Sequence, residues 1–484
     1  MKNKSNRFVM SVFRWLIFLG FSAQIILGIL WMFGNINKIQ MFGETAKIVA
    51  TSGNMLCDEF SGVLYPGILL LIRVICMSGS FPWYTLMYLI QIVLGFCAGF
   101  FLLREVNFYG RRWFACTWGS LVIMTFPFVM QNHLAILSNS VSLSLLMLET
   151  AFALKGWKRT ASKTDAEISG NAMADIACTG LFWVLGALNE WVLLYVGALP
   201  VLALVIKQIV SAAKKRKETG IKAQGGLKKL LVSITVIVAY LVIILGSNNY
   251  FSKHDIYSAD NRNVTKIVFE RLIWKSAFYR PASWMYEFSS VLDEGTMLTA
   301  SLYPSSVRTI IEPRMEEILG PEGAEELYKY CSNYLWTYRK KEIIHDMAID
   351  YAGYAISPVL VRMLLDDNTY VSYTMRNYDV MKRVTPRLTK WYVDYSLLWF
   401  EIALVLGSVI WALRLFERFR IEKDKREKTY PVFWIICILV GLVLSAWYMM
   451  QGSGVYDYKC SGFFTALYLL FAICSCSKNV TEDK

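Results

Sequence analysis

Two adjacent acids, Asp58 and Glu59, are the residues of this chain best suited to chemistry. They lie in the stretch NMLCDEFSGVLYP, residues 54–66, between two apolar runs. A carboxylate beside a partly buried pocket can accept a proton from an attacking hydroxyl, more readily where burial raises its pKa toward neutrality. Adjacent side chains on an extended segment point to opposite sides, so one acid would face the site and the other a partner or a metal. The alternative is a solvated acidic loop.

Two more candidates lie at the ends of apolar runs. His133 belongs to the stretch QNHLAILSNS, residues 131–140, where it can contact a phosphate or shuttle a proton, or be a polar turn residue. Glu190 follows Asn189 between two apolar runs, where it can orient an acceptor hydroxyl or simply cap the turn. Topology would place both residues on the outer side of a membrane.

Three basic residues are candidates for binding a phosphate. Arg73 and Arg280 carry guanidinium groups, whose planar fork of donors suits phosphate oxygens. Lys459 lies in the stretch GSGVYDYKC, close to Asp457. Each has an ordinary alternative: Arg73 can reach toward lipid headgroups, Arg280 can belong to an interfacial aromatic belt, and Lys459 can pair with Asp457.

Several familiar catalytic patterns are missing from the sequence. There is no phosphate-binding G-x-x-x-x-G-K-[ST], no H-E-x-x-H and no G-x-S-x-G. The cysteines show no spacing typical of zinc ligands, so no metal ligand is predicted. ATP-driven transport, zinc proteolysis and serine hydrolase chemistry therefore have no support.

The composition indicates a membrane protein. The chain has 484 residues, of which 56% are hydrophobic and 18% charged. Apolar runs near 20 residues recur, and each can cross the hydrocarbon layer as a helix, whereas barrel strands would alternate apolar and polar residues. The net charge of +13 is concentrated in short loops, where it orients a membrane protein, so no nucleic-acid partner is expected.

We predict an all-α polytopic protein with about ten transmembrane helices. A basic N-terminus precedes an uncleaved first span, which places both chain ends in the cytoplasm. The first outer loop, 34–82, contains a juxtamembrane or re-entrant helix at 63–77, because this assignment puts three basic loops on the cytoplasmic side. The predicted spans are about 15–33, 83–103, 113–130, 135–154, 174–188, 191–211 and 229–247 in an N-terminal membrane module (1–247), and 394–413, 431–450 and 461–476 in a C-terminal one (394–484).

Between the two modules lies a polar segment, 248–393, which we predict to be a mostly helical insert on the outer side. Within it, residues 312–349 have the pattern of helices, with Pro321 opening a second helix that has acids early and bases late.

The order of these features resembles the GT-C superfamily of membrane glycosyltransferases, with an organisation like that of protein mannosyltransferases. The shared features are a basic N-terminus with one span, an outer loop ending in Asp58 and Glu59, an aromatic surface helix, Pro-Trp-Tyr opening the next span, and the 131–140 stretch. They cover about residues 10–250. In that family an acid of the first outer loop acts as general base or positions the acceptor, which the resemblance implies for Asp58 within the Asp58–Glu59 pair.

The resemblance implies an enzyme that moves a sugar from a polyprenyl-phosphate donor to an acceptor at the outer face of the cytoplasmic membrane. The expected partners are the lipid-linked sugar and the membrane, and the expected substrate-binding residues are His133, Glu190, Arg73, Arg280 and Lys459. The chain differs from many members in carrying its polar segment before the last three spans. It also has no second acid cluster in the outer loop, so a divalent metal requirement stays open.

Two other functions stay open. A transporter or flippase of lipid-linked sugars would gather polar residues at the middle of the bilayer, whereas a transferase would gather them at the outer face. A non-catalytic scaffold would instead show an exposed apolar patch on residues 300–370.

Overall fold

The computed structural model describes residues 26, 62–77, 83–107, 136, 138–161, 170–190, 193–194, 197–219, 224–253, 312–338, 340–341 and 344. The regular structure of these residues is helical, which agrees with the predicted all-α class. The chain divides into two compact units. The first takes Met1–Tyr257, Asp379–Leu442 and Ser461–Lys484, and the second takes Ser258–Tyr378 and Val443–Cys460.

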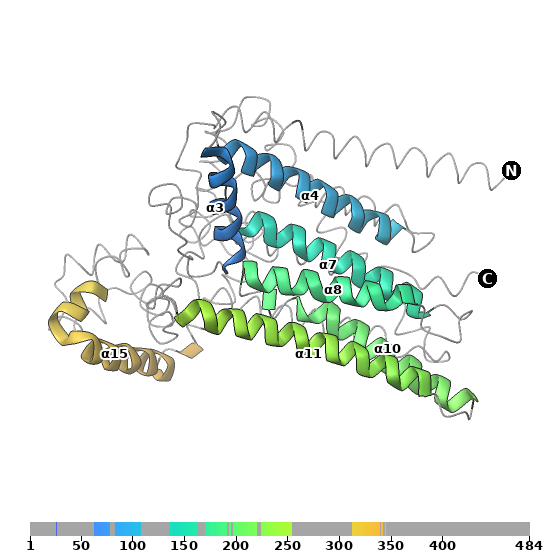
Figure 1. The fold of residues 1–484 in the computed structure, drawn as a ribbon. Helices are drawn as coiled ribbons and strands as arrows, with labels where there is room; N and C mark the ends of the chain where they lie inside the picture. Colours follow the sequence, from blue (N-terminus) through green and yellow to red (C-terminus); the bar gives the residue numbers. More distant parts are fainter. Residues whose placement is uncertain are drawn as a thin grey trace, which may run out of the picture. The chain divides into compact units, whose positions relative to one another are not determined.

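The described helices of the first unit pack around α7 (Figure 1). Helix α7 contacts α8 most extensively and also packs on α4 and α10, while α11 packs on α8 and α10, and α3 contacts α4 and α8. Their bounds are Leu64–Met77 for α3, Trp83–Asn107 for α4, Ser138–Ala161 for α7, Gly170–Asn189 for α8, Ala198–Thr219 for α10 and Gln224–Lys253 for α11.

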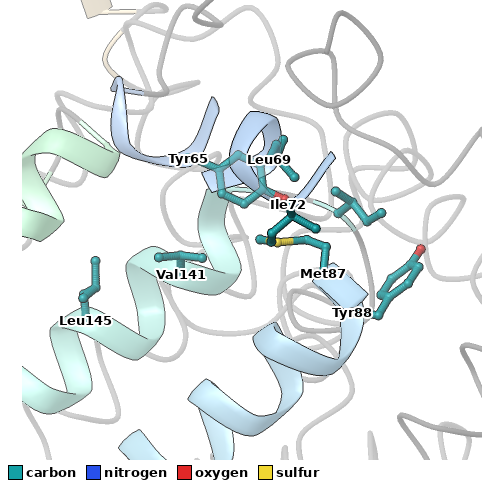
Figure 2. Close-up of a cluster of buried hydrophobic side chains, with 8 residues drawn as sticks. Tyr65, Leu69, Ile72, Met87, Tyr88, Val141 and Leu145 are labelled. Atoms are coloured by element: carbon teal, nitrogen blue, oxygen red, sulfur yellow. The ribbon is translucent and has the colours of Figure 1, made fainter. Parts of the chain in front are cut away.

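Helix α3 corresponds to the predicted helix 63–77 and presents one apolar face to the bundle. Tyr65, Leu69 and Ile72 recur at helical spacing and are all buried, as the packing of an amphipathic helix requires. Figure 2 shows this face of α3 meeting side chains of α4 and α7. The cluster also includes Met87 and Tyr88 of α4, Val141 and Leu145 of α7, and Ile136.

Helix α10 begins later than the sequence predicted. The apolar run suggested a span from residue 191, but α10 begins at Ala198. Pro200 explains the difference, since proline is tolerated in the first turn of a helix but removes a hydrogen bond and clashes in the interior. The predicted spans 15–33, 113–130, 394–413, 431–450 and 461–476 lie outside the described residues.

Two buried hydroxyl groups are satisfied within their own helices. Ser144 donates to the carbonyl of Ser140 at 2.9 Å, and Thr179 donates to that of Asp175 at 2.7 Å. A hydroxyl that bonds the carbonyl one turn earlier needs no partner from water. These helices can therefore bury polar residues in apolar surroundings.

Apolar side chains also line exposed faces of the described helices. On α4, Ile90, Val93 and Phe100 are exposed at helical spacing, and on α10 Leu202 and Ile206 are exposed in the same way. Among the described residues, one helix, Trp83–Leu102, is long and apolar enough to cross a membrane, with mean hydropathy 2.0. Shorter apolar helices are Leu64–Cys76, Met173–Asn189, Ala198–Ile209 and Leu231–Ser247. By length and composition, this single helix is weak support for a membrane location.

The contact of α8 with α11 depends on a small residue at position 180. A Cβ on Gly180 would overlap the ring of Tyr240, whose hydroxyl donates to the carbonyl of Ala177 at 3.0 Å. We expect Gly180→Ala to displace the ring and cost about 1–3 kcal/mol, the usual range for overpacking. Thermal unfolding in detergent measures it, and Tyr240→Phe, which removes only the hydroxyl, is the control. An unchanged melting temperature in Gly180→Ala would contradict this account.

The described part of the second unit contains α15, Glu312–Tyr338. It consists of two helices that meet at Gly320, where φ is 73°, a conformation that favours glycine. Pro321 then opens the second helix, as the sequence predicted, because its fixed φ suits a first helical turn. Exposed apolar side chains on α15 include Ile318, Tyr330 and Tyr338.

Candidate functional site

A turn at the end of α8 holds Asn189 and Glu190 in place. The amide of Glu190 donates to the carbonyl of Gly186 at 2.8 Å, and the amide of Leu193 donates to the carbonyl of Glu190 at 3.0 Å. The indole of Trp183 donates to the carbonyl of Leu194 at 3.0 Å, which ties the turn back to α8. Backbone and side-chain bonds thus fix the direction in which Glu190 leaves the helix.

Both side chains of this turn are buried against the start of α7. Ser138 donates its hydroxyl to Glu190 Oε1 at 2.7 Å. Asn189 Nδ2 donates to the carbonyl of Ser138 at 3.0 Å and to Ser142 Oγ at 2.7 Å. Asn189 is 0% exposed and Glu190 is 1% exposed. We call Ser138, Ser142, Asn189 and Glu190 the polar cluster.

The chain that enters α3 also touches this turn. The amide of Gly62 donates to the carbonyl of Asn189 at 2.6 Å. A Cβ at residue 62 would overlap the carbonyl oxygen of Leu188, so two backbones meet here without room for a side chain. Gly62 therefore fixes the start of α3 on the end of α8, beside the polar cluster.

Tyr65, in the first turn of α3, adds a buried hydroxyl near the polar cluster. It donates to Gln91 Oε1 of α4 at 3.2 Å. Burial raises the pKa of Tyr65 well above its usual value, and the nearby Tyr88 and Glu190 raise it further. Tyr65 therefore keeps its proton and acts as a donor throughout the physiological pH range.

Arg73 is the second predicted site residue that the structure describes. It lies two turns beyond Tyr65 on α3, roughly 12 Å along the helix axis, and is partly exposed. Its neighbours Leu71, Val74 and Ile75 are exposed apolar residues. Arg73 is therefore separated along α3 from the first turn, which meets the end of α8. Asp58, Glu59, His133, Arg280 and Lys459 lie outside the described residues.

The polar cluster has the chemistry of an oriented carboxyl group. A serine hydroxyl fixes one oxygen of Glu190, so this side chain is held in a set direction. Such a group can accept a proton or hold a hydroxyl of a bound molecule. Within the described residues, no three histidine, cysteine or acidic side chains gather in a way that could hold a metal ion.

Sequence reasoning missed the partners of Glu190 and one buried acid. Ser138 and Ser142 are separated from the α8 turn by about fifty residues of chain, and no local pattern reveals that pairing. Glu149, 2% exposed, lies within the predicted span 135–154. The sequence did contain a sign of this residue. An acid within the apolar run LLMLETAFAL is costly to bury in a membrane span and therefore suggests a function.

Comparison with family models, with curated proteins and with solved structures gives no match for this chain.

Proposed function

We propose that this protein is an integral membrane glycosyltransferase of the GT-C type. It transfers a sugar from a polyprenyl-phosphate donor to an acceptor hydroxyl at the outer face of the cytoplasmic membrane. In this proposal Asp58 is the general base, assisted by Glu59, and Glu190 orients the acceptor. The residues that bind the donor phosphate are His133, Arg73, Arg280 and Lys459.

The observation that carries this proposal is the meeting of three segments at the α8 turn. Gly62, within the first outer loop and just before α3, bonds to Asn189. Ser138, in the 131–140 stretch, bonds to Glu190. The sequence alone placed all three segments on the outer side of the membrane. Their convergence on buried polar groups is what a transferase site requires and a solvated acidic loop does not.

Covalent geometry keeps the proposed base close to this turn. Asp58 precedes Gly62 by four residues. A chain spans at most about 3.6 Å per residue, so the Cα atoms of Asp58 and Gly62 are within about 14 Å of each other. By the same argument, His133 is within about 18 Å of Ser138. These limits leave both residues able to approach Glu190, as the proposal requires.

The membrane topology is part of the proposal. Exposed apolar stripes on α4, α10 and α11, with acids buried between the helices, suit a bundle whose outside contacts lipid. We propose about ten spans with both termini in the cytoplasm, and α3 as a juxtamembrane or re-entrant helix at the outer face. Arg73 on α3 would then lie near the level of the lipid phosphates.

The proposed reaction needs little from the protein beyond positioning and a base. The acceptor oxygen attacks the anomeric carbon of the sugar, its proton passes to the Asp58 carboxylate, and the bond from that carbon to the phosphate oxygen breaks. The polyprenyl phosphate leaves with the bonding electron pair, so the leaving group needs no proton. Holding acceptor and donor together supplies much of the rate enhancement.

The test is Asp58→Asn in membranes supplied with polyprenyl-phosphate mannose or glucose labelled in the sugar. We expect transfer of label to non-lipid acceptors to fall at least about 100-fold, the usual contribution of a general base, with an unchanged amount of folded protein. Glu44→Gln, an acid-to-amide change in the same outer segment, should retain activity. Full activity in Asp58→Asn would rule out this mechanism.

The buried acid Glu149 favours a second candidate, a transporter of the same lipid-linked sugars. It lies eleven residues after Ser138, about 16 Å along α7, away from the polar cluster. A transporter would move labelled lipid across the bilayer of a reconstituted vesicle without transferring the sugar. The same labelled donors therefore distinguish the two functions.

A further inference from the structure

Glu149 is a buried carboxyl group with no role in the polar cluster. It is 2% exposed, and its Oε1 atom accepts no hydrogen bond. In the part of the chain that the structure describes, Glu149 forms no ion pair. Acids this deeply buried are normally paired, because an unpaired charge in apolar surroundings is very costly.

The carboxyl group points into a small space that exists because residue 197 is glycine. The position of a Cβ on Gly197 would be 2.9 Å from Glu149 Oε2, 2.7 Å from the carbonyl oxygen of Leu193 and 2.8 Å from Trp183 Cδ1. Two oxygen atoms thus face the same point. A carboxylate bordering this space would be a second acceptor with no donor between it and the carbonyl oxygen, whereas a carboxyl O–H can donate.

Two nearby donors among the described residues already have acceptors. The amide of Gly197 donates to the carbonyl of Leu193 at 3.0 Å, and the indole of Trp183 donates to that of Leu194 at 3.0 Å. Neither is directed at the carboxyl group of Glu149. The missing donor is most simply supplied by a proton on Glu149 itself.

Charged groups on the neighbouring helices are engaged at other levels of the bundle. Lys155 of α7 lies 3.6 Å from Asp175 of α8, and Lys207 of α10 lies over the ring of Trp157. Glu105 lies near the end of α4. At the α8 turn, Glu190 is bonded to Ser138.

We propose that Glu149 is a proton-binding site inside the helix bundle, occupied at neutral pH. Loss of the proton to water would leave a charge facing the Leu193 carbonyl and push α7 away from the turn of residues 190–197. That turn carries Glu190, so the proton on Glu149 helps to keep Glu190 in its position in the polar cluster. The inference stands whether or not the protein transfers sugars.

The first measurement compares melting temperature against pH for the wild type and Glu149→Gln, using the full chain in detergent. The amide is neutral at every pH and has a donor of similar shape. We expect similar stability near pH 4, where the carboxyl group is protonated in both the folded and the unfolded chain, and a steeper loss of stability in the wild type than in E149Q as pH rises from there through neutrality. Glu326→Gln, at an exposed site on α15, should keep the wild-type slope. Equal slopes in E149Q and the wild type would overturn the proposal.

The second measurement labels the site directly with dicyclohexylcarbodiimide, which partitions into apolar regions and reacts with protonated carboxyl groups. The acid proton passes to a carbodiimide nitrogen, the carboxyl oxygen bonds to the central carbon, and the acyl group then migrates to nitrogen without loss of atoms. Mass spectrometry of peptides should show the adduct on Glu149, with a labelling rate that falls about tenfold per pH unit once the group ionises. A rate that is independent of pH, or equally fast labelling by a water-soluble carbodiimide, would overturn the proposal.

Discussion

Replacing Gly62 with alanine is expected to separate α3 from the end of α8 and to destabilise the first unit. The new Cβ would overlap the carbonyl oxygen of Leu188 and lie 3.2 Å from the amide nitrogen of Asn189. These are backbone atoms, so no rotation of a side chain can relieve the overlap. The Gly62 hydrogen bond to Asn189 would be lost as well, and its donor and acceptor are both buried.

The expected cost combines two effects. Overpacking usually costs about 1–3 kcal/mol, and a buried backbone group left without its partner costs a further 1–3 kcal/mol or so. Expression, size-exclusion profile and thermal unfolding of the purified variant measure the loss. Gly246→Ala is the matched control, because a Cβ there meets nothing within 4 Å and alanine favours the helix. If both variants behave alike, the close approach at Gly62 does not hold α3 in place.

Local sequence patterns predicted the helices but not their contacts. The start of α4 at Trp83 follows from the proline before it and the apolar run after it, and the helix at α3 was predicted from the apolar run 63–77 and the charges of the later loops. Apolar patterns of this kind involve residues a few positions apart. They specify which face of a helix is apolar, but they do not specify which helix will cover it.

The polar cluster illustrates this limit. Glu190 was a candidate from its position between two apolar runs, and Ser138 belonged to the polar 131–140 stretch around His133, yet nothing in the sequence linked Ser138 or Ser142 to the α8 turn. Only the packing of α7 on α8 turns Ser142 toward Asn189 and Ser138 toward Glu190. The same packing buries Glu149 against Gly197, where hydropathy alone suggested an uninterrupted span.

Changing Asn189 to aspartate should be among the most damaging single substitutions in the first unit, although it preserves the size and shape of the side chain. The carbonyl of Ser138 can only accept a hydrogen bond, so the group that faces it must be the amide nitrogen of Asn189. A carboxylate has no donor to offer. It would leave the Ser138 carbonyl without this bond and place a second negative charge beside Glu190.

A buried group left unsatisfied costs about 1–3 kcal/mol, and a buried charge adds more. We therefore expect N189D to lower the free energy of unfolding by at least about 3 kcal/mol. Lower pH should reduce this loss of stability, because protonation of the new carboxyl group restores one hydrogen-bond donor. The measurement is thermal unfolding of N189D at neutral and acidic pH, with Asn333→Asp as the control at an exposed position of α15. If N189D is no less stable than N333D, the polar cluster does not hold α7 on α8. The orientation of Glu190 would then have to come from the backbone bonds of the turn, and Ser138 would be dispensable.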